Sequence, residues 1–402
     1  MIGDYFKFSI KTFRARQLRS WLTMIGVFIG IAAVVSLVSL GQGLQKAIGD
    51  LFAQMGTDKV IITPGTSFMG LSAGGIELKQ GDLDIIKKTS GVDLAGGYVY
   101  KYAQIKFKDE TKYTYVIGFP LDKSRRVISE VGYFKISDGR DLKEGDKYKA
   151  TVGITLGEGK LFSKKVNVGD NIEIEGQSFN VVGGMDRIGN PQDDSQVYIP
   201  IETAREALNV PDKYDMLMAK VSDPSAVQQV ADNIKKRLRD YRNVKKGEED
   251  FTIQTVNDLR DTYDTVLSIV QAVVIGIAAI SLFVGGVGIM NTMYTSVLER
   301  TSQIGVMKAV GATNKDILMI FLVESGVLGL VGGAVGIVFG ILISKLVSYI
   351  TVLAGITYIE SYFPWYLIVG ALAFSFIVGM IAGALPAYRA ANMKPVDALR
   401  YE

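Results

Sequence analysis

The 402-residue sequence contains no cysteine and no histidine. It therefore cannot form a zinc site built on Cys or His, a thiol nucleophile, a Ser-His-Asp triad or a disulfide bond. Any exported part of the chain has to be held together by its own apolar core. The net charge of only +3 gives no reason to expect nucleic acid as a partner.

A phosphate-binding loop for a nucleotide is also absent. The Gly159-Lys160 pair comes nearest, but Ile154 stands where the first glycine belongs and Leu161 where the Ser or Thr belongs. The adjacent Asp193 and Asp194 have no further acidic cluster beside them, so we interpret them as a hydrated turn instead of a metal site. We find no catalytic residues and expect no cofactor on this chain.

Charged residues are missing from four long runs: 21–45, 265–298, 325–344 and 361–388. A helix needs roughly 20 apolar residues to cross the hydrocarbon core of a membrane, and each run is long enough. The sequence therefore predicts a membrane α-helical protein with four transmembrane helices, at 21–45, 265–290, 317–345 and 364–388.

The positions of Lys and Arg predict how the spans are oriented. Basic residues precede the first span, lie between the second and third, and follow the fourth, whereas the loop 346–363 has none. Since basic loops stay in the cytoplasm, we expect both termini, the segment 291–316 and the tail 389–402 to be cytoplasmic, in a multi-pass protein of the cell membrane. For residues 1–20, a basic helix in the membrane interface and a simple charged flank are both open interpretations.

Residues 46–264 have the composition of a soluble domain and would lie outside the cell membrane. Strand patterns occur at 59–63, 98–118, 214–221 and 251–255, and an amphipathic helix pattern at 226–241. This order predicts a large α+β extracytoplasmic domain with a β-rich insertion at about 130–210. A hairpin is expected over 169–183, with a type II′ turn at Gly176-Gln177.

Two apolar patterns suggest contacts of the helices. The first helix continues beyond its span to about residue 53 as a stalk, with a stripe formed by Leu44, Ile48, Leu51 and Phe52. Water disfavours an uncovered apolar stripe. We therefore expect it to pack on the second stalk of the same chain, which is the segment before Leu267, on the stalk of another copy, or on both. Glycines four residues apart favour close packing of helices within the membrane: Gly26, Gly30, Gly332, Gly336 and Gly340.

Three motifs carry a resemblance to a known family. The segment 291–313, NTMYTSVLERTSQIGVMKAVGAT, resembles the cytoplasmic signature of the MacB/FtsX/lipoprotein-releasing class of ABC transporter permeases. Residues 19–30 resemble the entry of that family into its first span, and residues 386–402 resemble its C-terminal end. All three occur in the order of the family, so the resemblance covers the whole chain. The sequence looks like the stand-alone permease type, without a fused ATPase domain.

This resemblance implies a transport subunit that is not itself an enzyme. A separate ABC ATPase subunit, in two copies with ATP and Mg, would drive conformational change of the extracytoplasmic domain by mechanotransmission. The substrate to be exported or extracted would be a peptide, a lipid-linked molecule or an antibiotic-like compound. A second permease copy is implied, in a homodimer or a heterodimer, together with an extracytoplasmic adaptor or enzyme as a further partner.

The resemblance also places a coupling helix between the second and third spans. The residues from Thr301 to Val310 can form a short helix that Gly311 ends, and Ile304 and Lys308, four apart, would share one face of it. We expect the ATPase to contact Ile304, Gly305, Lys308 and Ala309, with Glu299 and Arg300 orienting the segment.

Two other functions stay open at this point. One is an FtsX-like transmitter that controls an extracytoplasmic enzyme, and the other is a membrane-anchored binding or sensory module without an energy partner.

Overall fold

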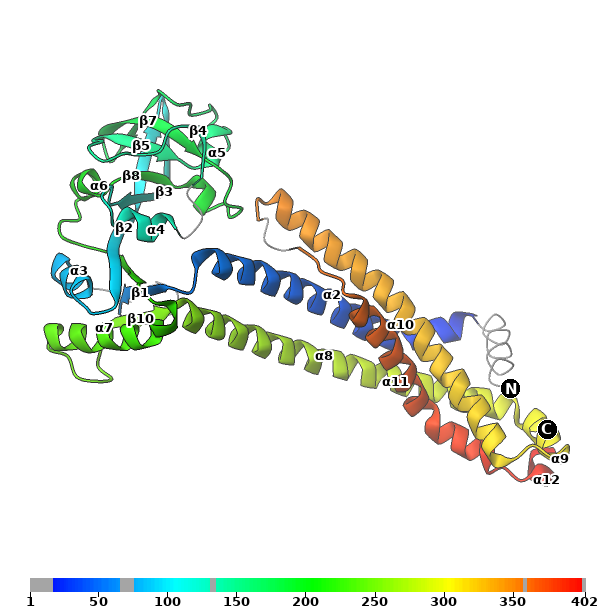
Figure 1. The fold of residues 1–402 in the computed structure, drawn as a ribbon. Helices are drawn as coiled ribbons and strands as arrows, with labels where there is room; N and C mark the ends of the chain where they lie inside the picture. Colours follow the sequence, from blue (N-terminus) through cyan, green and yellow to red (C-terminus); the bar gives the residue numbers. More distant parts are fainter. Residues whose placement is uncertain (1–16, 66–75, 131–134, 357–359, 400–402) are drawn as a thin grey trace. The chain divides into compact units, whose positions relative to one another are not determined.

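A computed structural model of the chain describes residues 17–65, 76–130, 135–356 and 360–399. These residues form two compact units. The first contains residues 17–45, 266–351 and 360–399, and the second contains 46–265 and 352–356 (Figure 1). Most of the interfacial helix that we considered for residues 1–20 lies outside the described residues.

The first unit is helical. Four of the described helices are long and apolar enough to cross a membrane, which confirms the predicted membrane fold: α2 (Gln17–Met55), α8 (Val256–Glu299), α10 (Asn314–Leu353) and α11 (Trp365–Ala391). Each is longer than its predicted span. The external loop expected from residue 346 begins later, because residues 346–354 contain no Gly or Pro. Gly355, which has a positive φ of 85°, comes two residues after the end of α10.

Glycines bring these helices into close contact. A Cβ atom added to Gly26 of α2 would lie 2.6 Å from the Cα of Gly285 in α8. On α10, a Cβ on Gly336 would lie 2.7 Å from the carbonyl oxygen of Phe28. Gly30, Gly332 and Gly340 are buried as well. Larger residues could not occupy the tightest of these positions without moving the backbone.

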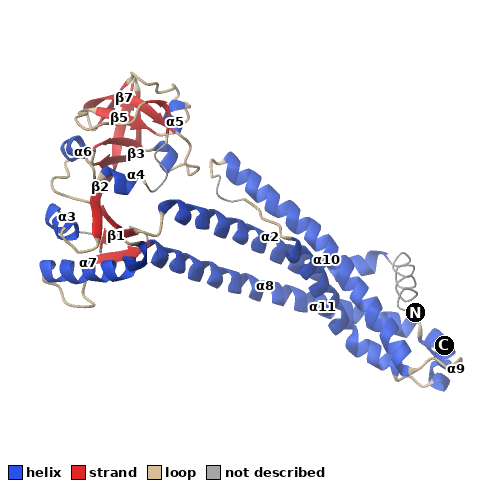
Figure 2. Cartoon of the chain, viewed as in Figure 1, coloured by secondary structure: helices blue, strands red, loops and turns tan. Residues whose placement is uncertain are grey.

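The second unit is built on a sheet (Figure 2). Ten strands of the described residues pair in the order β10-β1-β9-β2-β3-β8-β5-β7-β4, and β6 pairs with β2 and β7. The strands are β1 (Lys59–Pro64), β2 (Val92–Phe107), β3 (Glu110–Phe119), β4 (Ile136–Gly139), β5 (Lys149–Val152), β6 (Asn171–Ile174), β7 (Gln177–Met185), β8 (Val197–Pro200), β9 (Met216–Val221) and β10 (Phe251–Thr255).

Short helices cover parts of this sheet. α7 (Val227–Arg242) joins β9 to β10 and buries one apolar face against the sheet, as its sequence pattern predicts. The other helices are α3 (Gln80–Lys87), α4 (Arg125–Ser129), α5 (Ile154–Gly157) and α6 (Ile201–Ala207). Strands β4 to β8 all lie between residues 136 and 200, within the stretch where we expected β-rich structure.

One local prediction is wrong. β6 and β7 form the expected hairpin, but Ile174 pairs with Gln177, so the two loop residues are Glu175 and Gly176. Both have positive φ, 47° and 82°. This is the signature of a type I′ turn, because Gln177 already belongs to β7 and cannot be the second turn residue.

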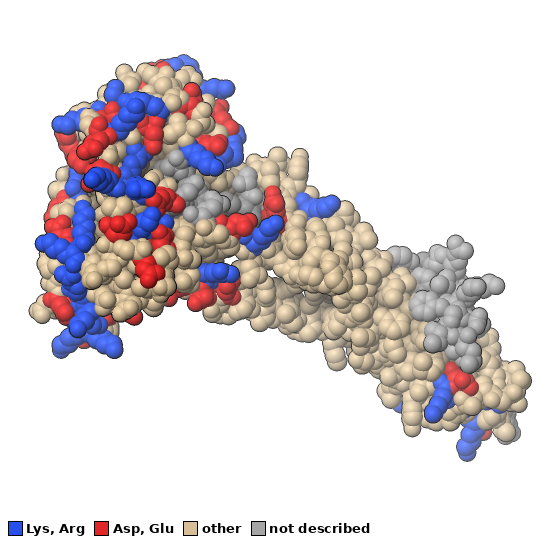
Figure 3. All heavy atoms as spheres, viewed as in Figure 1, with Lys and Arg blue, Asp and Glu red and all other residues tan. Residues whose placement is uncertain are grey.

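Charge is distributed very unevenly over the molecule. In Figure 3, acidic and basic side chains cover the visible surface of the sheet unit and gather again near α9. The visible face of the middle of the long helices has almost none. This is the distribution that a membrane-spanning segment requires, since an unpaired charge is costly in hydrocarbon.

Candidate coupling site

The short helix α9 (Thr301–Ala309) follows α8 after a single residue, Arg300. Gly311, with φ of 112°, comes just after it. The Gly311 N–H donates to the Lys308 carbonyl oxygen at 3.1 Å, and the Ala312 N–H donates to the Met307 carbonyl oxygen at 3.0 Å. This pair of bonds is a Schellman motif, which satisfies the last carbonyls of the helix. The helix that begins at Thr301 therefore ends before Gly311, as the sequence predicts.

The structure corrects the role that we expected for Ile304. Its side chain is 0% exposed and belongs to an apolar cluster with Met293, Val297 and Phe321. Gly305 is buried too. With only one residue between α8 and α9, the short helix folds back against its neighbours and buries the face that we expected to meet the ATPase. Ile304 and Gly305 are therefore packing residues of the permease.

A different face of α9 is exposed. It presents Ser302, Gln303, Val306, Ala309 and Val310. Val306 is 51% exposed, and it lines a hollow of about 420 Å³ together with Gln303 of α9 and Phe321 of α10. The spacing of Val306 and Val310, four residues apart, is visible in the sequence, but we gave Ile304 the role of the exposed apolar residue.

Two basic residues, Arg300 and Lys308, connect α9 to two membrane helices. The Arg300 guanidinium forms an ion pair with Glu324 of α10, 3.2 Å between Nη1 and Oε2. The Lys308 ammonium donates to the carbonyl oxygens of Ala391, the last residue of α11, at 2.5 Å and of Met393 at 2.8 Å. A cation at these carbonyls satisfies acceptors that the end of a helix leaves open. Glu299, which we expected to orient the segment, is exposed.

The stalk residues lie on the outer part of α2 and are half-buried: Leu44, Ile48, Leu51 and Phe52. The Phe52 ring contacts the Tyr263 ring of α8 edge to face, with 5.8 Å between the ring centroids. The second stalk of the same chain therefore covers part of the stripe. Packing against the stalk of another copy stays a prediction.

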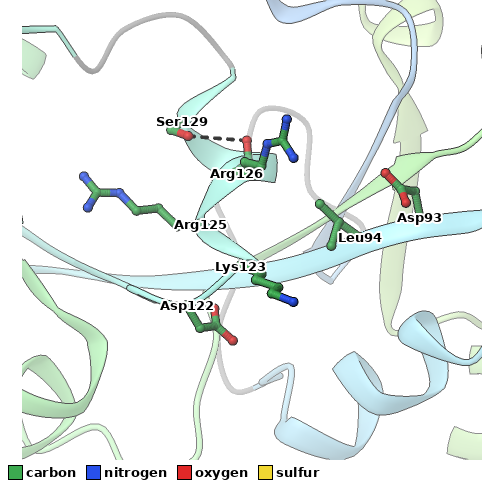
Figure 4. A pocket seen from close by; sticks show the side chains of 7 residues that line it. All are labelled: Asp93, Leu94, Asp122, Lys123, Arg125, Arg126 and Ser129. Carbon is green, nitrogen blue, oxygen red and sulfur yellow. Dashed lines mark hydrogen bonds between the residues drawn. The ribbon is translucent and has the colours of Figure 1, made fainter. Parts of the chain in front are cut away.

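The sheet unit also has a hollow of about 520 Å³ beside α4 (Figure 4). Arg126 and Ser129 extend from α4, and Asp93 and Leu94 lie on β2. Arg125 is already engaged, because its guanidinium forms an ion pair with Asp141 at 2.5 Å. Acidic and basic side chains alternate around the hollow, so its charge favours no class of ligand.

Asp193 and Asp194 are structural residues of a short 3-10 turn, η2 (Asp193–Ser195). Asp194 is buried, and its Oδ1 accepts the N–H of Ile188 at 2.6 Å. Our expectation of a hydrated turn is therefore wrong for Asp194. Asp193 accepts from the side chain of Gln196 at 2.8 Å, and burial raises the pKa of its carboxyl above the usual value. Within the described ranges no three acidic side chains gather as metal ligands would.

Two sequence families match the chain, and together they cover most of it. The MacB-like periplasmic core domain matches residues 20–237, and the FtsX-like permease C-terminal domain matches residues 275–395. The chain belongs to the MacB/FtsX family of ABC transporter permeases. The membrane helices and the α+β domain are therefore those of a transport subunit, and the α9 segment lies in the part that the FtsX-like domain matches.

Similar proteins include other permeases of this family. An uncharacterized ABC transporter permease of Methanocaldococcus jannaschii is 38% identical over 402 residues, with 100% of this chain and 98% of the relative covered. The uncharacterized ABC transporter permease YknZ of Bacillus subtilis is 30% identical, with 98% of each chain covered. The macrolide export protein MacB of Bdellovibrio bacteriovorus is also 30% identical, and this permease spans 61% of its length.

Among solved structures, the periplasmic region of MacB from Actinobacillus actinomycetemcomitans is similar, with a TM-score of 0.45 and 16% identity. The match covers 54% of this permease and 97% of that region.

Proposed function

We propose that this permease couples ATP hydrolysis by a separate ABC ATPase subunit to a conformational change of its extracytoplasmic domain. In this proposal α9 receives the movement of the ATPase, and the long helices carry it across the membrane. The observation that carries the proposal is α8, which is one unbroken helix of 44 residues from Val256 to Glu299. At about 1.5 Å per residue it is about 65 Å long.

The two ends of α8 lie next to the parts that would move together. β10 ends at Thr255, immediately before α8 begins. At the other end, α8 ends at Glu299 and α9 begins at Thr301. An α-helix resists bending and axial compression because each turn is closed by hydrogen bonds. A displacement of α9 is therefore expected to reach β10, the strand that immediately precedes α8 in the chain.

The contacts of Arg300 and Lys308 support the same proposal. Through them α9 is bonded to Glu324 of α10 and to the end of α11 at Ala391. A push on α9 would then be shared by three membrane helices. The exposed face around Val306 and Val310 is the surface that we propose for the ATPase contact.

The proposed assembly contains two ATPase chains, which hold ATP and Mg, and two permease copies, either identical or related. Each permease chain supplies one α9, and an ABC ATPase pair needs one such contact on each of its members. Basic residues flank the helices on the side of α9, so we place α9 and both termini in the cytoplasm and the sheet domain outside.

Export or extraction is the activity that we favour for this complex. Several relatives are named macrolide export proteins, and this supports an antibiotic-like substrate. A peptide and a lipid-linked molecule are the other substrate classes that we propose. Transmission of a signal to an extracytoplasmic enzyme would use the same movement. A transport assay with reconstituted vesicles and a panel of such compounds separates the two functions.

The ATPase contact is tested by a matched pair of substitutions at Val306. We expect Val306→Asp to abolish co-purification of the ATPase subunit, because a carboxylate would be desolvated in an apolar contact. Val306→Leu keeps the apolar character and should retain co-purification. Since the side chain is half-exposed in the permease, both variants should insert and fold normally. Full co-purification and stimulated ATPase activity of Val306→Asp would refute the assignment.

A further inference from the structure

A cluster of four charged side chains lies where the outer end of α2 meets the sheet. Lys220 of β9 donates to Glu130 Oε2 at 2.7 Å, and Lys59 of β1 lies 3.7 Å from the same oxygen. Lys59 also donates to Asp58 Oδ1 at 3.0 Å, and Lys220 Nζ is 3.8 Å from Asp58 Oδ2. Two cations thus alternate with two carboxylates. We call these four residues the charge clasp.

The clasp places a buried charge in the domain. The Lys59 side chain is only 3% exposed, and an unpaired ammonium in that position would be strongly unfavourable. Lys59 and Lys220 are also directly opposite each other on neighbouring antiparallel strands, an arrangement in which like charges repel. Glu130 and Asp58 each contact both lysines, but Asp58 is the chain neighbour of Lys59, whereas Glu130 comes from the end of α4. Removing the charge of Glu130 would leave the two opposed cations with one carboxylate, Asp58, to compensate both.

The clasp joins elements that are far apart in the sequence. Lys59 donates to the carbonyl oxygen of Met55, the last residue of α2, at 2.7 Å. Glu130 follows the last residue of α4. The outer end of α2 is therefore connected through Lys59 and Glu130 to α4, in addition to its connection to β1 along the chain.

An apolar core beside the clasp involves the second stalk as well. Met55 of α2 and Leu259 of α8 pack against one buried cluster that includes Val127 and Ile128 of α4. The same cluster contains Met185 of β7, a strand of the β-rich insertion. α4 thus packs in one core with the ends of both stalks and with the insertion.

We propose that Glu130 is a positioning residue through which movement of the stalks reaches the β-rich insertion. The charge clasp holds the end of α2 on α4, and the shared apolar core passes the displacement on to strands β4 to β8. This inference rests on the proposed ATP-driven movement of the stalks. It adds the route by which that movement changes the shape of the outer part of the domain.

The test follows amide hydrogen exchange in the full permease–ATPase complex in nanodiscs, with and without Mg-ATP and vanadate. Two segments are compared: residues 46–55 of the first stalk and residues 136–200 of the insertion. In the wild type we expect nucleotide to change the exchange of both. In Glu130→Gln the nucleotide-dependent change should persist in 46–55 and be lost in 136–200.

Arg126→Gln is the matched control. Arg126 is 75% exposed and its Nε lies 3.7 Å from the other oxygen of Glu130, so this variant removes a neighbouring charge of α4 but leaves the clasp intact. It should behave like the wild type. Lys59→Met, which removes the link from the end of α2 to Glu130 without leaving an unpaired buried cation, should reproduce the loss and replaces Glu130→Gln if that variant fails to fold.

The outcomes separate this inference from the function on which it rests. A nucleotide-dependent change in 136–200 that survives in Glu130→Gln and in Lys59→Met would overturn the role of the clasp. A wild type with no change in 46–55 would overturn the proposed coupling itself. A clasp that only stabilises the domain would raise exchange in both nucleotide states and leave their difference unchanged, which also contradicts the inference.

Discussion

Arg300 and Glu324 form an ion pair in which both side chains are largely buried, 17% and 11% exposed. The pair connects the residue between α8 and α9 to α10. Removing one partner of a buried ion pair leaves the other charge uncompensated, at a cost of about 3–5 kcal/mol. We expect Glu324→Gln to lower the stability of the helical unit by about this amount, as measured by thermal unfolding in nanodiscs.

The double variant Arg300→Met with Glu324→Leu is the control for that experiment. Replacing both charges by apolar side chains of similar size is often neutral for stability, so we expect it to unfold near the wild-type temperature. It should nevertheless weaken coupling to the ATPase. A single variant as stable as the wild type would show that the pair is not desolvated.

The burial of Ile304 predicts a contrast with its neighbour Val306. Ile304→Ala removes fully buried methyl groups and should cost about 2–5 kcal/mol. Val306→Ala acts on a half-exposed side chain and should change stability by less than about 0.5 kcal/mol. Chemical unfolding of the two variants measures the difference. Equal stabilities would contradict the packing of α9 described here.

Much of this fold follows from the sequence, and the exceptions have physical reasons. The uncharged runs predict the four membrane helices, and the pattern of α7 predicts its buried face. Which face of α9 is buried could not be predicted, because Ile304 and Val306 are both apolar and only the way the helix folds back decides between them. Contacts such as Lys59 with Glu130, 71 residues apart in the chain, depend on strand and helix positions that a local pattern does not contain.

The contact between α2 and α8 predicts a contrast between two neighbouring glycines. A Cβ on Gly285 would lie 2.5 Å from the backbone nitrogen of Val27, whereas on Gly286 its nearest neighbour would be the Cβ of Ala382 at 3.6 Å. Gly285→Ala should therefore push the helices apart and destabilise the unit by about 1–3 kcal/mol. Gly286→Ala should be neutral. Tolerance of both substitutions, measured by unfolding, would argue against the close contact.

The charge clasp should weaken in acid. The hydrogen bond from Lys220 lowers the pKa of the Glu130 carboxyl below its usual value of 4.5. For a carboxyl with a lowered folded pKa, the stabilisation is complete above the unfolded pKa and is lost as the pH falls through the folded one. The gap in unfolding temperature between the wild type and Glu130→Gln should thus be full at pH 7 and shrink in acid below pH 4.5. A gap that is independent of pH would contradict this.

The central claim is that ATP moves the outer ends of the stalks. The sequence has no cysteine, so Ala53→Cys, at an exposed position near the outer end of α2, carries one spin label in each permease copy. The decisive measurement is the distance between the two labels in the complex with the ATPase, by double electron–electron resonance, without nucleotide and with Mg-ATP and vanadate. The account predicts two distance distributions with different maxima. Identical distributions in a complex that hydrolyses ATP would contradict it.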